Sequence, residues 1–167
     1  MGETPLQISS FDDFIKRDQE ESTNKEQESL ETRLSNERLE WSSKIEVMGK
    51  KMKNVLGLTE LMVEVYTERQ RAVEYYHYLI SITSRLSKSY RKQWAQKYDH
   101  YTYNSQKRFP NEKSKELHIL SEISEVVSKR EAIDNHSKFI DNTIKTIDNI
   151  IYGIKYRIEI EQISRGN

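Results

Sequence analysis

Residues 140–158 read IDNTIKTIDNIIYGIKYRI, with isoleucines at alternating steps of four and three residues. Such steps place side chains on one face of an α-helix, here Ile140, Ile144, Ile147, Ile151, Ile154 and Ile158. The helix pattern extends over residues 131–164. Isoleucine at both seam positions favours assemblies larger than dimers, so this seam is predicted to join the subunits of a homo-oligomer. Further apolar side chains widen this face, so it is expected to serve both the packing within one chain and a neighbouring subunit: Phe139, Ile150, Ile160 and Ile163. Packing only within one chain is the alternative interpretation.

A second long helix is predicted upstream, over residues 59–104, where apolar side chains recur every three or four positions. At about 1.5 Å per residue it would be about 70 Å long, so it needs a long partner beside it. Pro110 ends helical structure at or before Phe109, and residues 104–114 are therefore a predicted loop where the chain turns back. A shorter helical stretch over residues 117–127 follows this loop.

The N-terminal part is predicted to contain one more helix, over residues 25–56, with an apolar seam that only Arg38 interrupts. Packing of this seam on neighbouring helices is favoured over a dedicated coiled coil. Gly57, followed by Thr59 and Glu60, is a typical signal for one helix to stop and another to start. One continuous helix through Gly57, at a cost of about 1 kcal/mol relative to alanine, is the alternative.

Residues 1–24 mix apolar side chains with acids, which is typical of a segment that is disordered when unbound, and Ser9 or Ser10 is a candidate cap for a short helix there. The predicted units are an acidic, partly helical N-terminal extension, residues 1–50, and a helical domain with an oligomerising C-terminal helix, residues 51–167. The predicted fold class is all-α: a long helical hairpin of three to four helices that assembles into a homo-oligomer through helix seams.

The composition describes a chain of 167 residues with 35% hydrophobic and 32% charged residues, and with only five glycines and two prolines. That profile suits long helices with one buried stripe each, whose remaining apolar surface needs a partner. The absence of cysteine excludes disulfides and thiolate metal sites. No apolar run approaches the roughly 20 residues of a membrane span, and the first residues lack a secretory signal. We therefore expect a cytoplasmic protein with no membrane partner.

Charge is segregated along the chain although the total is zero. Residues 1–47 hold twelve acids and six bases, whereas residues 75–108 hold seven bases, one acid and seven of the ten tyrosines. Basic residues interleaved with aromatic rings suit single-stranded nucleic acid, because cations pair with phosphates and rings stack on bases. The acidic part has three interpretations: it shields the basic stretch, it docks on another protein, or it only keeps the chain soluble.

Helical geometry separates two faces within the basic stretch. Arg85, Lys88 and Lys92 fall opposite the apolar stripe. Arg91 lies at the border of the stripe, and Lys97 falls within it. A solvated face is the alternative to a binding site, but such a face usually mixes both charge signs. The predicted DNA contacts are the cations and rings of this stretch: Arg85, Lys88, Arg91, Lys92, Lys97, His100, Tyr103, Lys107 and Arg108.

The sequence does not indicate catalytic chemistry. The four histidines are dispersed without metal-ligand spacing, and no glycine-rich phosphate loop, HExxH or GxSxG motif is present. We expect a protein that is not an enzyme and that needs no cofactor and no metal.

The order of these features resembles a known family. Basic residues lead into a D-x-Y cluster at Lys97, Asp99 and Tyr101, and the isoleucine-rich final helix ends in I-K-x-R-I at residues 154–158. Over roughly residues 60–163 the chain looks like the UvsY-type recombination mediators of T-even and related phages.

The resemblance implies an all-helical subunit in a ring-shaped homo-oligomer, located in the cytoplasm of the host cell. Such mediators bind single-stranded DNA, contact the single-strand-binding protein that coats it, and help the phage recombinase form its filament. Ala95 stands where the family has the first of two basic residues, but Lys88, Arg91 and Lys92 lie a turn or two earlier. Residues 1–50 have no counterpart in the family. A structural coiled-coil adaptor or scaffold without nucleic-acid binding is the alternative function.

Overall fold

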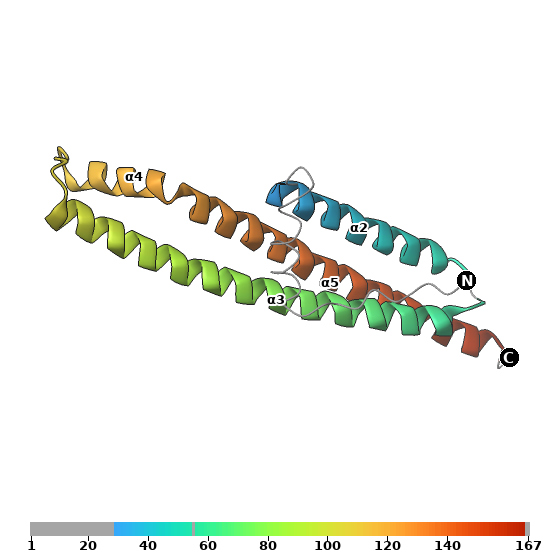
Figure 1. Cartoon of the computed structure of the whole chain (residues 1–167). Coiled ribbons are helices and arrows are strands. Elements are labelled where there is room, and N and C mark those ends of the chain that lie inside the picture. The colour runs from blue at the N-terminus through green and yellow to red at the C-terminus, as the bar shows by residue number, and fades with distance from the viewer. Residues whose placement is uncertain (1–28, 55, 166–167) are drawn as a thin grey trace, which may run out of the picture.

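The computed structural model describes residues 29–54 and 56–165 of the chain. This part contains four α-helices, one short π-helix and no strand, which confirms the predicted all-α class. In chain order they are α2 (Leu30–Lys51), α3 (Leu58–Asp99), the π-helix η2 (His100–Asn104), α4 (Glu112–Glu122) and α5 (Ser124–Arg165), shown in Figure 1. Together these helices form an elongated rod.

The two longest helices, α3 and α5, have 42 residues each and lie side by side in opposite directions (Figure 1). Polar contacts at both ends fix this direction. Arg69 near the start of α3 pairs with Asp148 far along α5, with Nε and Oδ1 2.6 Å apart. Lys97 near the end of α3 pairs with Glu122, just before α5 begins, with Nζ and Oε2 3.0 Å apart. Each long helix is thus the long partner that the other needs.

The shorter α2 lies beside only one half of this pair (Figure 1). Lys51 at its end pairs with Glu64 of α3, with Nζ and Oε2 2.7 Å apart. Lys44, seven residues earlier, pairs with Glu68, with Nζ and Oε2 3.4 Å apart. Because the α2 positions fall as the α3 positions rise, α2 runs antiparallel to α3. Its first turn lies near the middle of the rod.

Local signals in the sequence explain where the helices begin. The Ser29 hydroxyl caps α2 by accepting a hydrogen bond of 3.2 Å from a backbone N–H of the first turn. The Asn111 side chain caps α4 in the same way, at 2.8 Å. Gly57 precedes α3 with φ 105°, a left-handed conformation that glycine adopts at low cost. The predicted interruption at Gly57 is therefore confirmed.

The core runs through the half of the rod where three helices meet. Four of the five buried side chains of α3 recur at steps of seven: Leu58, Val65, Ala72 and Leu79. Those of α2 follow the same step: Leu34, Trp41 and Met48. This regular step is typical of helices that pack along a shared seam, and all these residues belong to one cluster. The predicted domain boundary at residue 50 lies at the end of α2, between helices that share this core.

The predicted isoleucine seam of α5 lies inside the same core. Four of its six members are buried and two are partly buried: Ile140, Ile147, Ile151 and Ile154, and then Ile144 and Ile158. Contacts with α2 and α3 of the same chain account for this burial, as the alternative interpretation has it. Each fully buried isoleucine contributes about 1.5–3 kcal/mol to folding. Contact between subunits through this seam stays a prediction.

One polar cluster inside the core joins the three helices. His136 of α5 is fully buried, with Nε2 3.0 Å from Glu37 Oε2 of α2 and 3.3 Å from the Tyr75 hydroxyl of α3. Arg38 Nε donates to His136 Nδ1 at 3.4 Å, so both ring nitrogens of His136 have partners inside the core. Burial alone would raise the pKa of Glu37, but hydrogen bonds with His136 and Tyr75 outweigh it and lower this pKa. Burial and the charge of Glu37 raise the pKa of Tyr75.

Two helix ends differ from the prediction. The helix predicted over residues 25–56 ends at Lys51. The helix predicted over residues 59–104 changes to π-helix at His100. The short helix predicted within residues 1–24 lies outside the described residues.

After the loop, helical structure starts earlier and is divided elsewhere than predicted. The Asn111 cap starts α4 directly after Pro110, and Ile123 separates α4 from α5. Neither glycine nor proline marks this break, so the apolar pattern predicted one stretch across it, over residues 117–127. α5 begins at Ser124 rather than near residue 131.

Candidate nucleic-acid interface

α3 changes character midway along its length. Residues 58–79 contain all of its buried side chains, and we call this part the covered half. From residue 80 to residue 99 no side chain of α3 is buried, and we call this part the uncovered half. The change follows from the position of α2, because among the described helices only α4 and the start of α5 lie against the uncovered half (Figure 1).

Four of the predicted DNA contacts lie exposed on the uncovered half and form what we call the basic row: Arg85, Lys88, Arg91 and Lys92. Arg91 Nε donates one long hydrogen bond, 3.4 Å, to the backbone carbonyl of Ser87. Lys88 and Lys92 make no hydrogen bond or ion pair with another described residue. Their ammonium groups therefore keep their donors available for an anion.

The basic row differs from the exposed lysines of α5. Lys129, Lys138 and Lys145 each pair with an acid four residues earlier, at 2.5–2.7 Å. Such pairs are the usual pattern of a solvated helix face. The basic row has no acid within a helical turn on α3, because Asp99 is the first acid after Glu74. Its charge is therefore not balanced within its own helix.

The aromatic side chains beside the basic row are engaged within the chain. Tyr90 and Trp94 are partly buried, with ring centroids 6.1 Å apart. The guanidinium carbon of Arg130, on α5, lies 5.0 Å from the centroid of the Tyr90 ring. This cation–π contact joins α5 to α3 and occupies one face of the Tyr90 ring.

The end of the rod beyond α3 is a basic and aromatic tip, made of η2, residues 105–111 and α4. In η2 the Ser105 N–H donates to the His100 carbonyl at 2.8 Å, a π-type hydrogen bond that widens the last turn. Such turns occur frequently at functional sites. His100 and Tyr103 are exposed, and Tyr103 keeps 79% of its surface accessible. Both rings can stack on a base without rearrangement of the core.

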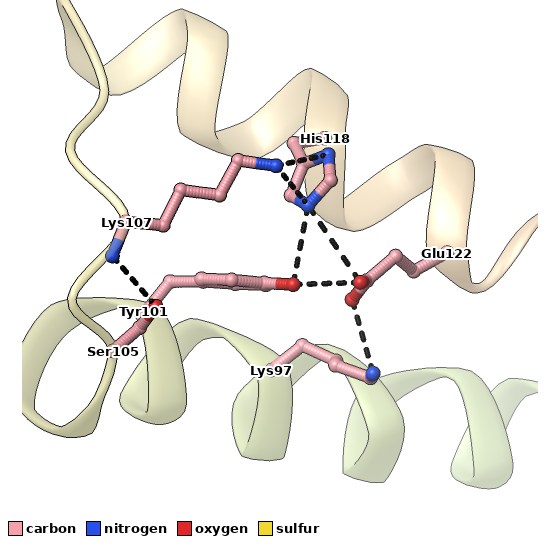
Figure 2. Close-up of polar contacts among 6 residues, drawn as sticks. All are labelled: Lys97, Tyr101, Ser105, Lys107, His118 and Glu122. Carbon is pink, nitrogen blue, oxygen red and sulfur yellow. Dashed lines mark hydrogen bonds and ion pairs between the residues drawn. The ribbon is translucent and has the colours of Figure 1, made fainter.

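A polar network centred on Tyr101 ties α4 to the end of α3 (Figure 2). The Tyr101 hydroxyl donates to Glu122 Oε1 at 2.6 Å and lies 3.1 Å from His118 Nε2. The other carboxylate oxygen of Glu122 pairs with Lys97 at 3.0 Å. From the loop, Lys107 Nζ reaches His118 Nε2 at 2.9 Å. The network therefore holds Lys97 and Lys107 in place.

The same network shifts two ionisation equilibria in opposite directions. Hydrogen bonds from Tyr101 and Lys97 lower the pKa of Glu122. The hydrogen bond to Glu122 raises the pKa of Tyr101. At neutral pH Glu122 is thus a carboxylate and Tyr101 a neutral donor, which is the state that the geometry requires.

The predicted contact residues fall into two groups. The basic row extends along α3, whereas His100, Tyr103, Lys107 and Arg108 gather at the tip. Lys97 lies between the two groups and is directed to Glu122 rather than to solvent alone. Lys107 contacts His118, and Arg108 is exposed in the loop.

Sequence reasoning missed the residues that close the tip. Lys115 of α4 keeps only 9% of its surface exposed, and its Nζ lies 3.1 Å from Thr102 Oγ1 and 3.0 Å from Glu112 Oε1. His118 and Glu122 complete the Tyr101 network. The available signal was the return of acids after the basic stretch, at Glu112, which pairs with Lys115 of its own helix, and at Glu122, which pairs with Lys97 across the turn.

The described residues contain no group of three or more histidine, aspartate or glutamate side chains placed to hold a metal ion. None of the described helices has the uncharged apolar stretch needed to cross a membrane. Comparisons with known protein families, with curated proteins and with solved structures found no match.

Proposed function

We propose that this protein is a recombination mediator that binds single-stranded DNA and helps to load a phage recombinase onto DNA covered by single-strand-binding protein. The observation that carries the proposal is the basic row, four exposed cations on α3 without an acid within a helical turn. Phosphate contacts of this kind are independent of base sequence. That property suits a protein that must act anywhere along a strand.

The tip supplies the second element of the proposed interface. Tyr103 and His100 stack on bases, and each stacked base contributes about 1–3 kcal/mol. The basic row lies on α3, and the tip rings lie on η2, which continues α3 directly. A strand that follows α3 toward the tip therefore meets the cations first and the rings second. The Tyr101 network keeps the tip rigid, which lowers the entropic cost of binding.

Assembly completes the proposal. Several copies of a helical hairpin in a homo-oligomer, in the cytoplasm of the host cell, would present several basic rows to one strand. Avidity then arises without high affinity for each subunit. DNA drawn away from its coating protein becomes accessible to the recombinase, which supplies any nucleotide hydrolysis.

The test is a fluorescence polarisation titration with a labelled single-stranded oligonucleotide at several salt concentrations. The logarithm of affinity is expected to fall with the logarithm of salt by about 0.7 per phosphate neutralised. In Lys88→Ala/Lys92→Ala the slope should be shallower by about 1.4. The matched control is Lys138→Ala/Lys145→Ala, which removes two exposed lysines of α5 and should leave the slope unchanged. Equal slopes in all three proteins would remove the basic row from the interface.

One observation favours the alternative, a coiled-coil adaptor or scaffold. Large apolar side chains lie exposed at the end of the rod opposite the tip: Val63, Tyr66, Tyr152, Tyr156, Ile160 and Ile163. Exposed apolar surface of this kind is typical of a protein-binding face. An adaptor would not bind the oligonucleotide at either low or moderate salt, so the same titration separates the two functions.

A further inference from the structure

The positions of α3 that face α2 continue beyond the end of α2. In the covered half these positions are known from contacts: Glu64 with Lys51, Glu68 with Lys44 and Tyr75 with Glu37. Since the buried residues of α3 repeat every seven positions, the same face continues at seven-residue steps into the uncovered half. The steps from Glu64 reach Arg85 and Lys92, and those from Tyr75 reach Ile82 and Ser89. We call this set the α2-facing line.

The charge on the α2-facing line reverses between the two halves. In the covered half it carries two acids, Glu64 and Glu68, against which α2 places lysines, and one cation, Arg71, which pairs with Glu68, so the line is net acidic there. In the uncovered half it is basic, at Arg85 and Lys92, and no third helix of the described chain lies there. A helix or strand that continued the path of α2 would therefore need acids where α2 has lysines.

The chain itself has such a segment in the right place. Residues 1–28 contain eight acids and three bases, a net charge of −5, and they join α2 at its Ser29 cap near the middle of the rod. Residues 80–130, which make up the opposite half of the rod, contain eleven bases and five acids, a net charge of +6. Residues 1–28, which are attached at Ser29, and the half of the rod beyond α2 thus have nearly equal and opposite net charges.

Apolar side chains and length fit as well. Ile8, Phe11, Phe14 and Ile15 recur at helical steps, beside Asp12 and Asp13. From residue 80 to residue 99 the uncovered half extends about 30 Å, whereas 28 residues extend about 42 Å even as a helix. The segment is therefore long enough to reach the end of α3.

We propose that residues 1–28 lie along the uncovered half of α3, on the continuation of the α2-facing line, and that nucleic acid must displace them from the basic row. The second part of this inference depends on the proposed function, and the first does not. A tethered segment acts at an effective concentration on the order of millimolar, so weak contacts suffice to hold it. Salt weakens them, because the charges at the surface are screened.

The contact can be measured with a thiol probe, since the chain contains no cysteine. Ser89→Cys places a thiol on the α2-facing line, and Ser84→Cys places one on the exposed side of the same helix as a matched control. Phe11→Ser/Phe14→Ser in the full chain should speed alkylation of the Ser89→Cys thiol by about tenfold if nine molecules in ten are covered. The Ser84→Cys rate should not change. The same acceleration is expected with Asp12→Asn/Asp13→Asn.

A second arm measures binding of a labelled single-stranded oligonucleotide at low salt. Phe11→Ser/Phe14→Ser should bind about tenfold more tightly than the native chain, because the competing segment is released. The control Leu39→Ser, which removes an exposed apolar side chain of α2, should bind the oligonucleotide as the native chain does. Unaltered affinity would overturn the competition.

The two arms fail separately. If no variant binds DNA, the alkylation rates still decide whether the segment covers α3, and only the proposed function is lost. Equal alkylation rates in the native and variant chains would overturn the covering itself. Protection of the Ser89→Cys thiol that disappears on dilution would overturn it too, because another copy of the chain would then be the occupant.

Discussion

The two halves of α3 share one apolar stripe but have different surroundings. Leu79 and Leu86 are seven residues apart on the same face, yet Leu79 is buried to 1% exposure and Leu86 is only partly buried. Charges show the same contrast, because Glu64 is paired with α2 whereas Lys92 has no partner among the described residues. The difference shows that the third helix decides which part of α3 is core and which part remains available for binding.

The largest expected effect follows from this pair of leucines. Leu79→Ala removes a fully buried side chain and should lower the free energy of unfolding by about 2–5 kcal/mol. Leu86→Ala should lower it by only about 1 kcal/mol, because less apolar surface is buried there. Urea denaturation followed by circular dichroism measures both values. The two substitutions are also compared in the Phe11→Ser/Phe14→Ser background, where the N-terminal segment should no longer cover Leu86. If Leu79→Ala and Leu86→Ala cost the same unfolding free energy in both backgrounds, the division of α3 into halves is contradicted.

A second pair compares carboxylates of the two halves. Glu37→Gln weakens the hydrogen bonds to buried His136 and should cost about 1–3 kcal/mol of unfolding free energy. Glu122→Gln, at the tip, should cost about 0–1 kcal/mol, because its ion pair is exposed to solvent. Both are read from urea denaturation at neutral pH, and a larger loss for Glu122→Gln would reverse the comparison.

The pH dependence of stability sharpens that comparison. The pKa of Glu37 is lowered in the folded chain, so its contribution is complete above the ordinary value of 4.5 and is lost as pH falls through the lowered pKa. The difference in unfolding free energy between the native chain and Glu37→Gln should therefore shrink in acid. A difference that stays constant from neutral pH to about pH 3 would show that ionised Glu37 does not stabilise the core.

Assembly provides a third comparison, between the inside and the outside of α5. If the proposed homo-oligomer forms through the exposed apolar face, Tyr152→Ser/Ile163→Ser should reduce its mass in sedimentation without loss of helix content. Ile147→Asn/Ile154→Asn changes the predicted seam and should also unfold the subunit, since both isoleucines are fully buried within one chain. An unaltered mass for the first variant would leave the seam as the predicted interface.

Much of the fold could be predicted from the sequence because its signals are local. The seven-residue repeat of isoleucines in α5, the glycine before α3 and the proline in the loop each determine structure within a few residues. The break at Ile123 could not be predicted, because no local signal marks it. The partner of the isoleucine face could not be predicted either, because a helical stripe does not indicate which helix packs against it.

The candidate site was predictable in part for the same reason. The exposed cations of the basic row follow from the lack of acids around Lys88 and Lys92. The engagement of Lys97 and Lys107 was not predictable, because Glu122 and His118 approach them only after the chain turns back at the tip. Pairing across a turn depends on the loop geometry, which spacing along one helix does not describe.

The smallest expected effect concerns Ala95, which is exposed on the uncovered half where the resembling family has a basic residue. Ala95→Lys adds one cation beyond the basic row, so the slope of log affinity against log salt should become steeper by about 0.7. Asn149→Lys on α5 is the matched control, because it adds the same charge at an exposed position beside the covered half. Equal effects of the two variants would show that net charge alone sets binding. A change confined to Ala95→Lys would instead mean that the strand follows α3 from the basic row to the tip.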